Sequence, residues 1–262
     1  MKKTIIRFLA VLVAVTTASA ASLAGTYVQQ VGYDAPDGDR ITGFIYQAEG
    51  TRKDAPLAVL MHGLMGSSLY WLADDNLMYG DDVTAELIER GYRVVALDAR
   101  AHGARIRDEK PIAYVKAARS GDSAAYEAMI SGTVQDYRFF LDKILSRYSE
   151  TMQVLVVGYS MGAQMGTMLA AQDERVTHLV TMVPPAVRNV PAVSPIRFAP
   201  EVKIPWLLII AEEDEYSSQQ QNEELAAAAG RAPETRSFDS KHVLPADYVK
   251  TVEEWIDRTR QQ

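Results

Sequence analysis

Residues 154–163 are Val-Leu-Val-Val-Gly-Tyr-Ser-Met-Gly-Ala, and this stretch decides the fold. A short apolar run, rich in β-branched residues and typical of a buried strand, stops at Gly158, and a helical pattern begins directly after Gly162. Ser160 lies between the glycines in a tight turn that strains its backbone, and a Cβ atom at either glycine would collide with the neighbouring strand or helix. A chance match is the alternative, but the strand before and the helix after argue against it. The pattern predicts that the Ser160 hydroxyl projects from the edge of a sheet, in front of free N–H groups at a helix N-terminus.

The first twenty residues differ from the rest of the chain. Met1-Lys2-Lys3 is a basic start, residues 5–15 are mostly apolar, and Ala18-Ser19-Ala20 is a small-residue cleavage site. This pattern predicts a secretory signal peptide over residues 1–20, followed by one domain over residues 21–262. An uncleaved anchor is the alternative. No later stretch is long and apolar enough to predict a membrane span.

Composition narrows the classes of partner. The 262 residues are 48% hydrophobic and 23% charged, as in an ordinary globular protein. Three of the 27 basic residues lie in the predicted signal peptide, so the mature chain would hold 24 basic and 34 acidic side chains, a formal charge of −10. Such an acidic chain argues against binding nucleic acid or anionic membranes. Without cysteine it has neither disulfides nor thiolate metal sites, and together with the lysine-led signal this favours export in a bacterium, to the periplasm or the medium.

Hydrophobic patterning predicts the order of the elements. Residues 26–31 and 41–47 alternate and flank a turn, so they are expected to form an antiparallel pair. Further strands are expected over 57–61, 93–97, 154–158, 178–183, 206–211 and 235–238, and helices from Asp81, as N-cap, to Gly91, then over 133–147, after 162, over 219–229 and over 245–258. Residues 99–132 are charged and irregular, and residues 184–205 form a proline-rich, helix-poor loop. The order predicts a single α/β domain with a mostly parallel, eight-stranded sheet flanked by helices.

A serine hydroxyl needs a base to take its proton, and four histidines are available. His178 opens an apolar strand and is expected to be structural. His62 ends a strand, next to a glycine loop, and His102 lies in the loop after a strand. His242 falls between the last strand and the last helix, downstream of a group of acids, and is the best candidate for the base.

The acid that orients the base should follow a strand end. Residues 212–215 are all acidic and directly follow the strand that ends at residue 211. Asp214 is preferred because a short side chain in this loop suits the reach to His242, with Glu213 as the second choice. Asp239 is too close to the histidine in sequence, and the other two acids of the cluster are expected to be solvated.

The chain order Ser160, Asp214, His242, together with the elbow, resembles that of the α/β-hydrolase family. Residues 62–66, His-Gly-Leu-Met-Gly, are similar to the family's oxyanion loop after the third strand. Residues 98–103, Asp-Ala-Arg-Ala-His-Gly, are similar to its Asp-x-Arg-Gly-His-Gly turn. The resemblance runs from about residue 26 to the last helix. It implies the α/β-hydrolase fold and a serine hydrolase that needs no metal or organic cofactor.

The resemblance also implies an oxyanion hole and shows two departures. The backbone N–H groups of Leu64 and Met161 would bind the oxyanion of a tetrahedral intermediate. Ala101 replaces the usual glycine of the turn, which would reshape the loop that carries His102. Ala211 replaces a glycine often found before the acid.

Only 53 residues separate Ser160 from Asp214, which leaves no room for a large lid there. The segment 98–133 and the loop 65–79 are expected to wall the site instead. An equal alternative for Tyr70 and Trp71 is that they pack the loop onto the domain. The side chains expected to line the pocket are Leu64, Met65, Tyr70, Trp71, Tyr159 and Met161.

An open site of this kind favours hydrolysis of small or short-chain carboxylic esters, or of acyl groups on a polymer. Two alternatives stay open: a serine peptidase or amidase using the same triad, and a non-catalytic binding module of this fold. The oligomeric state does not follow from the sequence.

Overall fold

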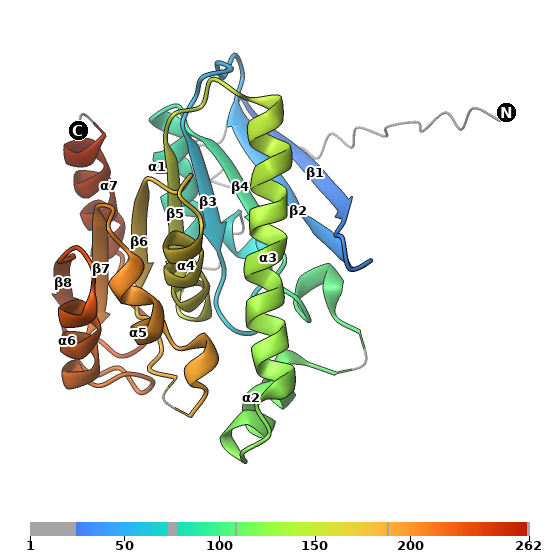
Figure 1. Ribbon diagram of the computed structural model, residues 1–262. Helices are drawn as coiled ribbons and strands as arrows, with labels where there is room; N and C mark the ends of the chain where they lie inside the picture. The colour runs from blue at the N-terminus through green and yellow to red at the C-terminus, as the bar shows by residue number, and fades with distance from the viewer. Residues whose placement is uncertain (1–24, 73–77, 108, 188, 261–262) are drawn as a thin grey trace, which may run out of the picture.

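Eight strands form one sheet in the order β1-β2-β4-β3-β5-β6-β7-β8 (Figure 1). The computed structural model describes residues 25–72, 78–107, 109–187 and 189–260, so the predicted signal peptide lies outside the described residues. The strands β3 to β8 run parallel, and the hairpin of β1 and β2 joins them antiparallel through β4. The strands are β1 (Thr26–Asp34), β2 (Arg40–Ala48), β3 (Leu57–Met61), β4 (Arg93–Leu97), β5 (Val154–Tyr159), β6 (His178–Met182), β7 (Trp206–Ala211) and β8 (Glu234–Phe238).

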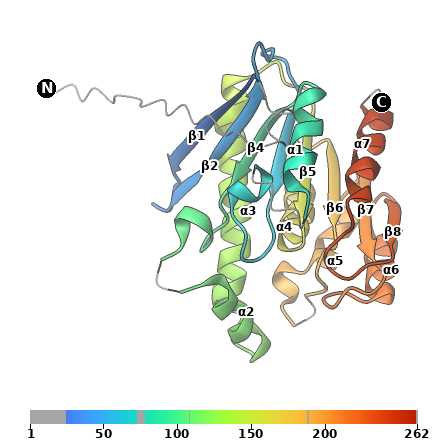
Figure 2. The same cartoon turned by 180° about the vertical axis from the view of Figure 1, so that it is seen from behind.

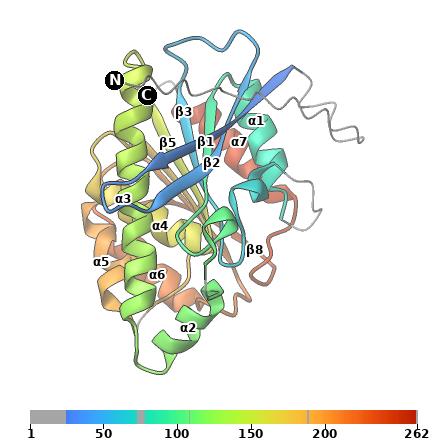
Figure 3. The ribbon, with the colours of Figure 1, turned by 90° about the vertical axis from the view of Figure 1, so that its right-hand side faces the viewer.

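Helices cover both faces of the sheet (Figures 1, 2 and 3). Side chains of α3, α4 and α6 pack on one face, and those of α1 and α7 pack on the other. The helices are α1 (Gly80–Glu89), α2 (Pro111–Arg119), α3 (Ala124–Arg147), α4 (Met161–Gln172), α5 (Pro195–Phe198), α6 (Gln219–Ala228) and α7 (Asp247–Thr259). The predicted fold, a mostly parallel eight-stranded sheet flanked by helices, is therefore confirmed.

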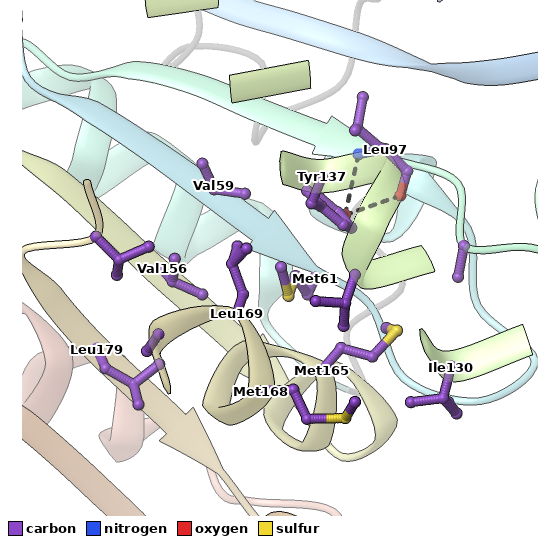
Figure 4. Close-up of a cluster of buried hydrophobic side chains, with 14 of the residues drawn as sticks. Val59, Met61, Leu97, Ile130, Tyr137, Val156, Met165, Met168, Leu169 and Leu179 are labelled. Carbon is purple, nitrogen blue, oxygen red and sulfur yellow. Dashed lines mark hydrogen bonds between the residues drawn. The ribbon is translucent and has the colours of Figure 1, made fainter. Parts of the chain in front are cut away.

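The central strands are buried on both sides. Every residue of β3, β4, β5 and β7 is buried, which explains why these strands are continuous apolar runs and do not alternate. Figure 4 shows Val59, Val156 and Leu179, from three neighbouring strands, facing Met165 and Leu169 of α4. This packing fixes α4 directly over β5, and hence fixes the turn between them.

The register aligns the strand ends that carry the loops of interest. Met61, the last residue of β3, pairs with Gly158, and Tyr159, the last of β5, pairs with Met182 of β6. At the end of β7, Ala211 pairs with Phe238 of β8. The loops after β3, β5, β6, β7 and β8 therefore all leave the same carboxyl edge of the sheet.

The segment 99–132 is more regular than its sequence suggests. It contains α2, which begins with a proline at its first turn, and α3 begins at Ala124, nine residues before the predicted start. Gly132 and the charged residues hide the helical pattern, but Gly132 is needed where it stands. A Cβ atom there would lie 2.7 Å from the guanidinium of Arg100, which cannot easily move because two hydrogen bonds hold it to the buried Asp136 carboxylate. Both α2 and the first turns of α3 extend past the carboxyl edge of the sheet (Figures 1 and 3).

The predicted N-cap of α1 is wrong. Tyr79, in the left-handed conformation at φ 54°, is the N-cap, and Asp81 lies in the first turn, where its charge favours the helix dipole. The described residues of the proline-rich stretch 184–205 include three short helical turns, η4 (Pro191–Val193), α5 and η5 (Ala199–Glu201). No helix among the described residues combines the length and the apolarity that a membrane span requires.

Candidate active site

The turn between β5 and α4 holds Ser160 at φ 54° and ψ −117°, a conformation that strains a residue with a side chain. A Cβ atom at Gly158 would clash with the carbonyl of Gly162, and one at Gly162 would clash with the carbonyl of Met61 at the end of β3. The Ser160 N–H donates to the carbonyl of Met182 at 2.8 Å, which ties the turn to β6. The two glycines are therefore needed because backbone atoms occupy the space of a side chain.

Three side chains from distant parts of the chain meet at this turn. The His242 Nε2 atom lies 2.8 Å from Ser160 Oγ, and its Nδ1 atom lies 3.0 Å from each carboxylate oxygen of Asp214. A carboxylate only accepts hydrogen bonds, so Nδ1 carries the ring proton and Nε2 is free to accept the serine proton. The structure thus brings together the three residues that the sequence predicts as nucleophile, acid and base.

The geometry also separates the members of the acidic cluster. The Asp214 side chain is fully buried and accepts the backbone N–H of Tyr216 at 2.8 Å, while the Glu213 side chain is exposed. Glu215 is exposed as well, but it is not merely solvated, because its carboxylate accepts the backbone N–H of His242 at 3.1 Å. Hydrogen bonds from its own N–H and from that of His242 hold the pKa of Glu215 below its usual range. Asp214, and not Glu213, is in contact with the histidine.

The oxyanion loop approaches the serine closely. Residues 63–66 form a turn in which the Gly66 N–H donates to the Gly63 carbonyl at 3.1 Å, and Met65 takes φ 67°. A Cβ atom on Gly63 would lie 3.4 Å from the Ser160 Cβ atom, so the loop lies against the nucleophile. Met161, as the first residue of α4, has an N–H with no acceptor inside the helix. The N–H groups of Leu64 and Met161 are thus on the two segments that flank the serine.

The ring of His62 connects this loop to the next one, a role that the sequence does not reveal. Its Nε2 atom accepts the Ala99 N–H at 3.0 Å, so Nδ1 carries the proton and donates to the Gly63 carbonyl at 2.8 Å. Burial, followed by the neighbouring His102, lowers the pKa of His62 to about 4. His62 is therefore a neutral, structural residue at neutral pH.

Asp98 organises the surroundings of the oxyanion loop. One carboxylate oxygen accepts the N–H and the hydroxyl of Ser68, both at 2.8 Å, and the other accepts the Thr42 hydroxyl at 2.7 Å and the Ala104 N–H at 3.2 Å. These bonds join β2, the loop after β3 and the loop after β4. The sequence predicts that Asp98 lies at the end of a strand. It does not predict the hydrogen-bond partners of Asp98, because most of them are distant in sequence.

The departure at Ala101 does not remove the turn. Ala101 takes φ 62°, the left-handed conformation that favours glycine. Next to it, the Nδ1 atom of buried His102 donates to the Arg100 carbonyl at 2.9 Å. The alanine is therefore strained at this position of the turn. His178 opens β6, at the edge of the sheet opposite Ser160, in agreement with a structural role.

The predicted pocket residues divide into two groups. Met65 is 56% exposed, and Leu64 and Tyr70 are half-buried. Trp71 and Tyr159 have no exposed surface and pack in the core beneath α1 and α7, so the prediction that they line a pocket is wrong. Trp71 instead packs the loop onto the domain, with its ring edge-to-face against Tyr70 at 4.7 Å. The Met161 side chain is also buried, on the sheet face that α3, α4 and α6 cover. Only the backbone N–H of Met161 is therefore a candidate group of the site.

A buried glutamine connects the segment 98–133 to the helix of the elbow. Gln164, wholly buried in α4, accepts the Tyr126 hydroxyl at 2.8 Å and donates to the Val193 carbonyl at 2.7 Å. Tyr126 belongs to α3 and Val193 to η4, so both elements are anchored to α4 one turn after Ser160. The segment is therefore held beside the helix that follows Ser160, and its role as a wall of the site stays a prediction. Part of the other predicted wall, residues 73–77, lies outside the described residues.

The groups gathered at this edge are side chains and backbone N–H groups of three loops. Within the described parts of the chain, no three His, Asp or Glu side chains come together in a way that would hold a metal ion. The serine hydroxyl can pass its proton to the histidine, which the buried carboxylate orients, and two N–H-bearing segments flank the serine.

Solved structures of other proteins share the fold of this chain. The chain resembles, at 22% identity and a TM-score of 0.70, a cold-adapted esterase from an Arctic intertidal metagenomic library, over 89% of this chain and 94% of that one. It resembles an esterase of Pyrococcus furiosus at 18% identity and a TM-score of 0.68, over 94% and 97% of the two chains. For a serine hydrolase without lid from Xanthomonas campestris the values are 18% and 0.65, over 88% and 94%. At these identities the likeness is one of fold.

No curated protein matches the chain in sequence. Residues 58–261 match the model of the alpha/beta hydrolase family, which is most of the chain and includes the elbow, the oxyanion loop and the three hydrogen-bonded side chains. The chain therefore belongs to the alpha/beta hydrolase family.

Proposed function

We propose that this protein is a serine hydrolase that cleaves carboxylic esters with small or short-chain acyl groups. The observation that carries the proposal is the 2.8 Å contact between His242 Nε2 and Ser160 Oγ, with Nδ1 bound to a buried Asp214. The fold neighbours described as esterases support it.

The proposed reaction follows from these contacts. Ser160 Oγ attacks the ester carbonyl carbon while its proton passes to His242 Nε2, and the N–H groups of Leu64 and Met161 bind the oxyanion. The intermediate collapses, the C–O bond to the leaving group breaks, and the imidazolium returns the proton to the leaving alcohol. Water then attacks the acyl-enzyme by the same route and frees Ser160 and the acid. Asp214 keeps the ring oriented and stabilises its positive charge in both halves.

A short-chain preference is proposed because α3 and η4 are both anchored to α4, so neither of these two elements is free to act as a lid. The residue that most clearly offers surface to an acyl or alcohol group is Met65, which is exposed on the oxyanion loop. Small esters and the acyl groups of a polymer both suit such an open site.

One assay tests the proposed activity. The mature protein is offered p-nitrophenyl esters from acetate to octanoate and, in parallel, an aminoacyl anilide, with Ser160→Ala as the control. Turnover is expected to be highest for the short esters and to vanish in the variant, and a fluorophosphonate is expected to label Ser160. Turnover of the anilide alone would contradict the esterase proposal and favour a peptidase. No turnover of any substrate and no labelling of Ser160 would favour a non-catalytic binding module.

We also propose that residues 1–20 direct export and are removed, which makes the mature protein periplasmic or secreted in a bacterium. The basic start, the apolar run and the Ala18-Ser19-Ala20 site support this proposal. Expression of the full chain in a bacterial host, followed by fractionation and intact-mass measurement, tests it. The expected product lacks residues 1–20 and lies outside the cytoplasm; a full-length cytoplasmic product would contradict it.

A further inference from the structure

Tyr159, directly before the nucleophile, points away from the site and into the core. Alternation along β5 puts its ring on the face covered by α1 and α7, where it is wholly buried with Leu244 and Tyr248. Its ring lies 6.1 Å from the ring of His242, edge-to-face. A residue covalently joined to Ser160 thus extends beneath the loop that carries the proposed base.

The Tyr159 hydroxyl binds that loop twice. It donates to the His242 carbonyl at 2.8 Å and accepts the Leu244 N–H at 3.1 Å. The two bonds close around the residue between them, Val243, which is 49% exposed. One buried hydroxyl therefore satisfies both backbone groups that flank an exposed position.

The backbone N–H of His242 is bound by the acid loop after β7. The His242 N–H donates to the Glu215 carboxylate at 3.1 Å, and the Ser240 carbonyl accepts the Glu213 N–H at 3.0 Å. Residues 239–246 contain neither helix nor strand, so no ladder of main-chain hydrogen bonds fixes this loop. These contacts with the nucleophile strand and the acid loop, together with the burial of Leu244 and the Tyr216 ring 4.6 Å from that of His242, hold the loop in place.

We propose that Tyr159 is a positioning residue, whose hydroxyl holds the His242 loop at the height that lets the imidazole reach Ser160 Oγ. The proposal rests on the proposed function of this site, because it concerns the same proton transfer. Tyr159 touches neither the reacting atoms nor solvent, so it acts only through the loop.

The chemistry of the hydroxyl suits this role. Burial raises the pKa of Tyr159 to about 12, so the proton that it donates to the His242 carbonyl stays in place at any pH where ester hydrolysis is measured. Removing the hydroxyl would leave that carbonyl and the Leu244 N–H without their partner, and the loop would move to find water. A proton transfer over 2.8 Å is sensitive to such a movement.

Tyr159→Phe is the test, and Tyr248→Phe is its matched control. The Tyr248 ring lies 6.2 Å from that of Tyr159 in the same buried layer, but its hydroxyl donates to the Met78 carbonyl and not to the base loop. Both variants remove one buried hydroxyl and keep the ring. On a short p-nitrophenyl ester, Tyr159→Phe is expected to lower kcat by about 10- to 100-fold with KM within about twofold, while Tyr248→Phe keeps kcat within about twofold.

A second readout is independent of turnover. The Nδ1 proton between His242 and Asp214 should give a downfield proton NMR signal in the wild type and in Tyr248→Phe, identified by its loss in Asp214→Asn. This signal is expected to broaden or shift in Tyr159→Phe, and thermal melts are expected to show both Phe variants folded at the assay temperature.

The outcomes separate the two proposals. The positioning role would be overturned if Tyr159→Phe had the kcat and the NMR signal of the wild type. It would also be overturned if Tyr159→Phe and Tyr248→Phe lost kcat to the same extent. If the wild type hydrolyses no ester and no fluorophosphonate labels Ser160, the proposed function fails, and the NMR signal alone then decides whether Tyr159 positions His242.

Discussion

The ring of His62 accepts the backbone N–H of Ala99 at 3.0 Å, and this bond joins the loop after β3 to the loop after β4. The same ring donates to the Gly63 carbonyl, so one buried imidazole sets the relative position of the oxyanion loop and the Asp98 turn. The bond requires an unprotonated Nε2 atom, and burial provides it by disfavouring the charged form. This relationship makes the stability of the domain depend on pH.

Stability is expected to fall between pH 6.5 and pH 4 because of His62. Its pKa is about 4 in the folded protein against 6.5 when exposed, so the unfolded state binds the extra proton in this window. The contribution is fully present above pH 6.5 and is lost as the pH falls toward 4; from pH 7 to pH 5 the loss is about 2 kcal/mol. Urea unfolding at both pH values measures it.

The control for this prediction is His62→Gln, whose amide oxygen can accept the Ala99 N–H but cannot titrate. Its unfolding free energy is expected to change by about 2 kcal/mol less between pH 7 and pH 5 than that of the wild type. Parallel pH dependences of the two proteins would show that His62 is not the responsible group.

The choice between the two acids is directly testable. Asp214→Asn keeps the shape of the buried side chain but disturbs the tautomer of His242, and kcat is expected to fall by about 10⁴-fold. Glu213→Gln changes an exposed side chain and is expected to leave kcat within about twofold. Ester turnover of the two purified variants decides the matter, and the reverse order of losses would assign the acid to Glu213.

Gly162→Ala is expected to destabilise the protein by about 3 kcal/mol or more. Its Cβ atom would clash with the Met61 carbonyl, and backbone on both sides cannot move without disturbing β3 or α4. Gly32→Ala is the control, because its Cβ atom would meet only the end of the flexible Arg40 side chain at 2.8 Å. Chemical denaturation should show a cost within about 1 kcal/mol for the control; similar costs for both would contradict the steric argument.

Ala101→Gly is expected to stabilise the protein by about 0.5–1 kcal/mol. The substitution removes the strain of an alanine at φ 62°, and the gain is partly offset by the greater freedom of glycine in the unfolded chain. In Ala113→Gly, within α2, the same chemical change should cost about 1 kcal/mol. Thermal and urea unfolding compare the two, and the signs must be opposite if the strain at Ala101 is real.

Asp136→Asn is expected to cost about 3 kcal/mol. Asp136 is buried in α3 and binds the guanidinium groups of Arg100 and Arg105 at 2.7 Å each, so the substitution removes the buried carboxylate that both share and leaves them only the more exposed Asp37 and Asp39. The matched variant Asp34→Asn breaks an exposed pair with Arg40 at the same distance and should cost less than about 1 kcal/mol. Equal losses in urea unfolding would contradict the role of burial.

Features encoded in contiguous residues could be predicted from the sequence. The runs 57–61, 93–97 and 206–211 match β3, β4 and β7 residue for residue, because strands buried on both faces must be apolar throughout. The elbow glycines were predictable for a steric reason that applies to any strand-turn-helix of this kind. The segment that forms α2 and the start of α3 could not be predicted in this way. Gly132, which breaks the helical pattern in the sequence, is there because of its contact with Arg100 and not because of a local backbone preference.

The parts that depend on distant partners needed the tertiary structure. Four successive acids follow β7, and neighbouring residues in a loop point their side chains in different directions. Only the folded loop therefore decided that Asp214 is buried against the ring of His242 and that Glu215 binds the His242 backbone N–H. The same holds for Tyr159, which is expected from the sequence to line the pocket but lies on the strand face that packs into the core. By itself the sequence determined the sheet, the strained serine and the order of the three polar side chains, because these depend on hydrophobic periodicity and local sterics. Which atoms meet was decided by the packing of segments far apart in the chain, because a hydrogen bond depends on position to within a fraction of an ångström.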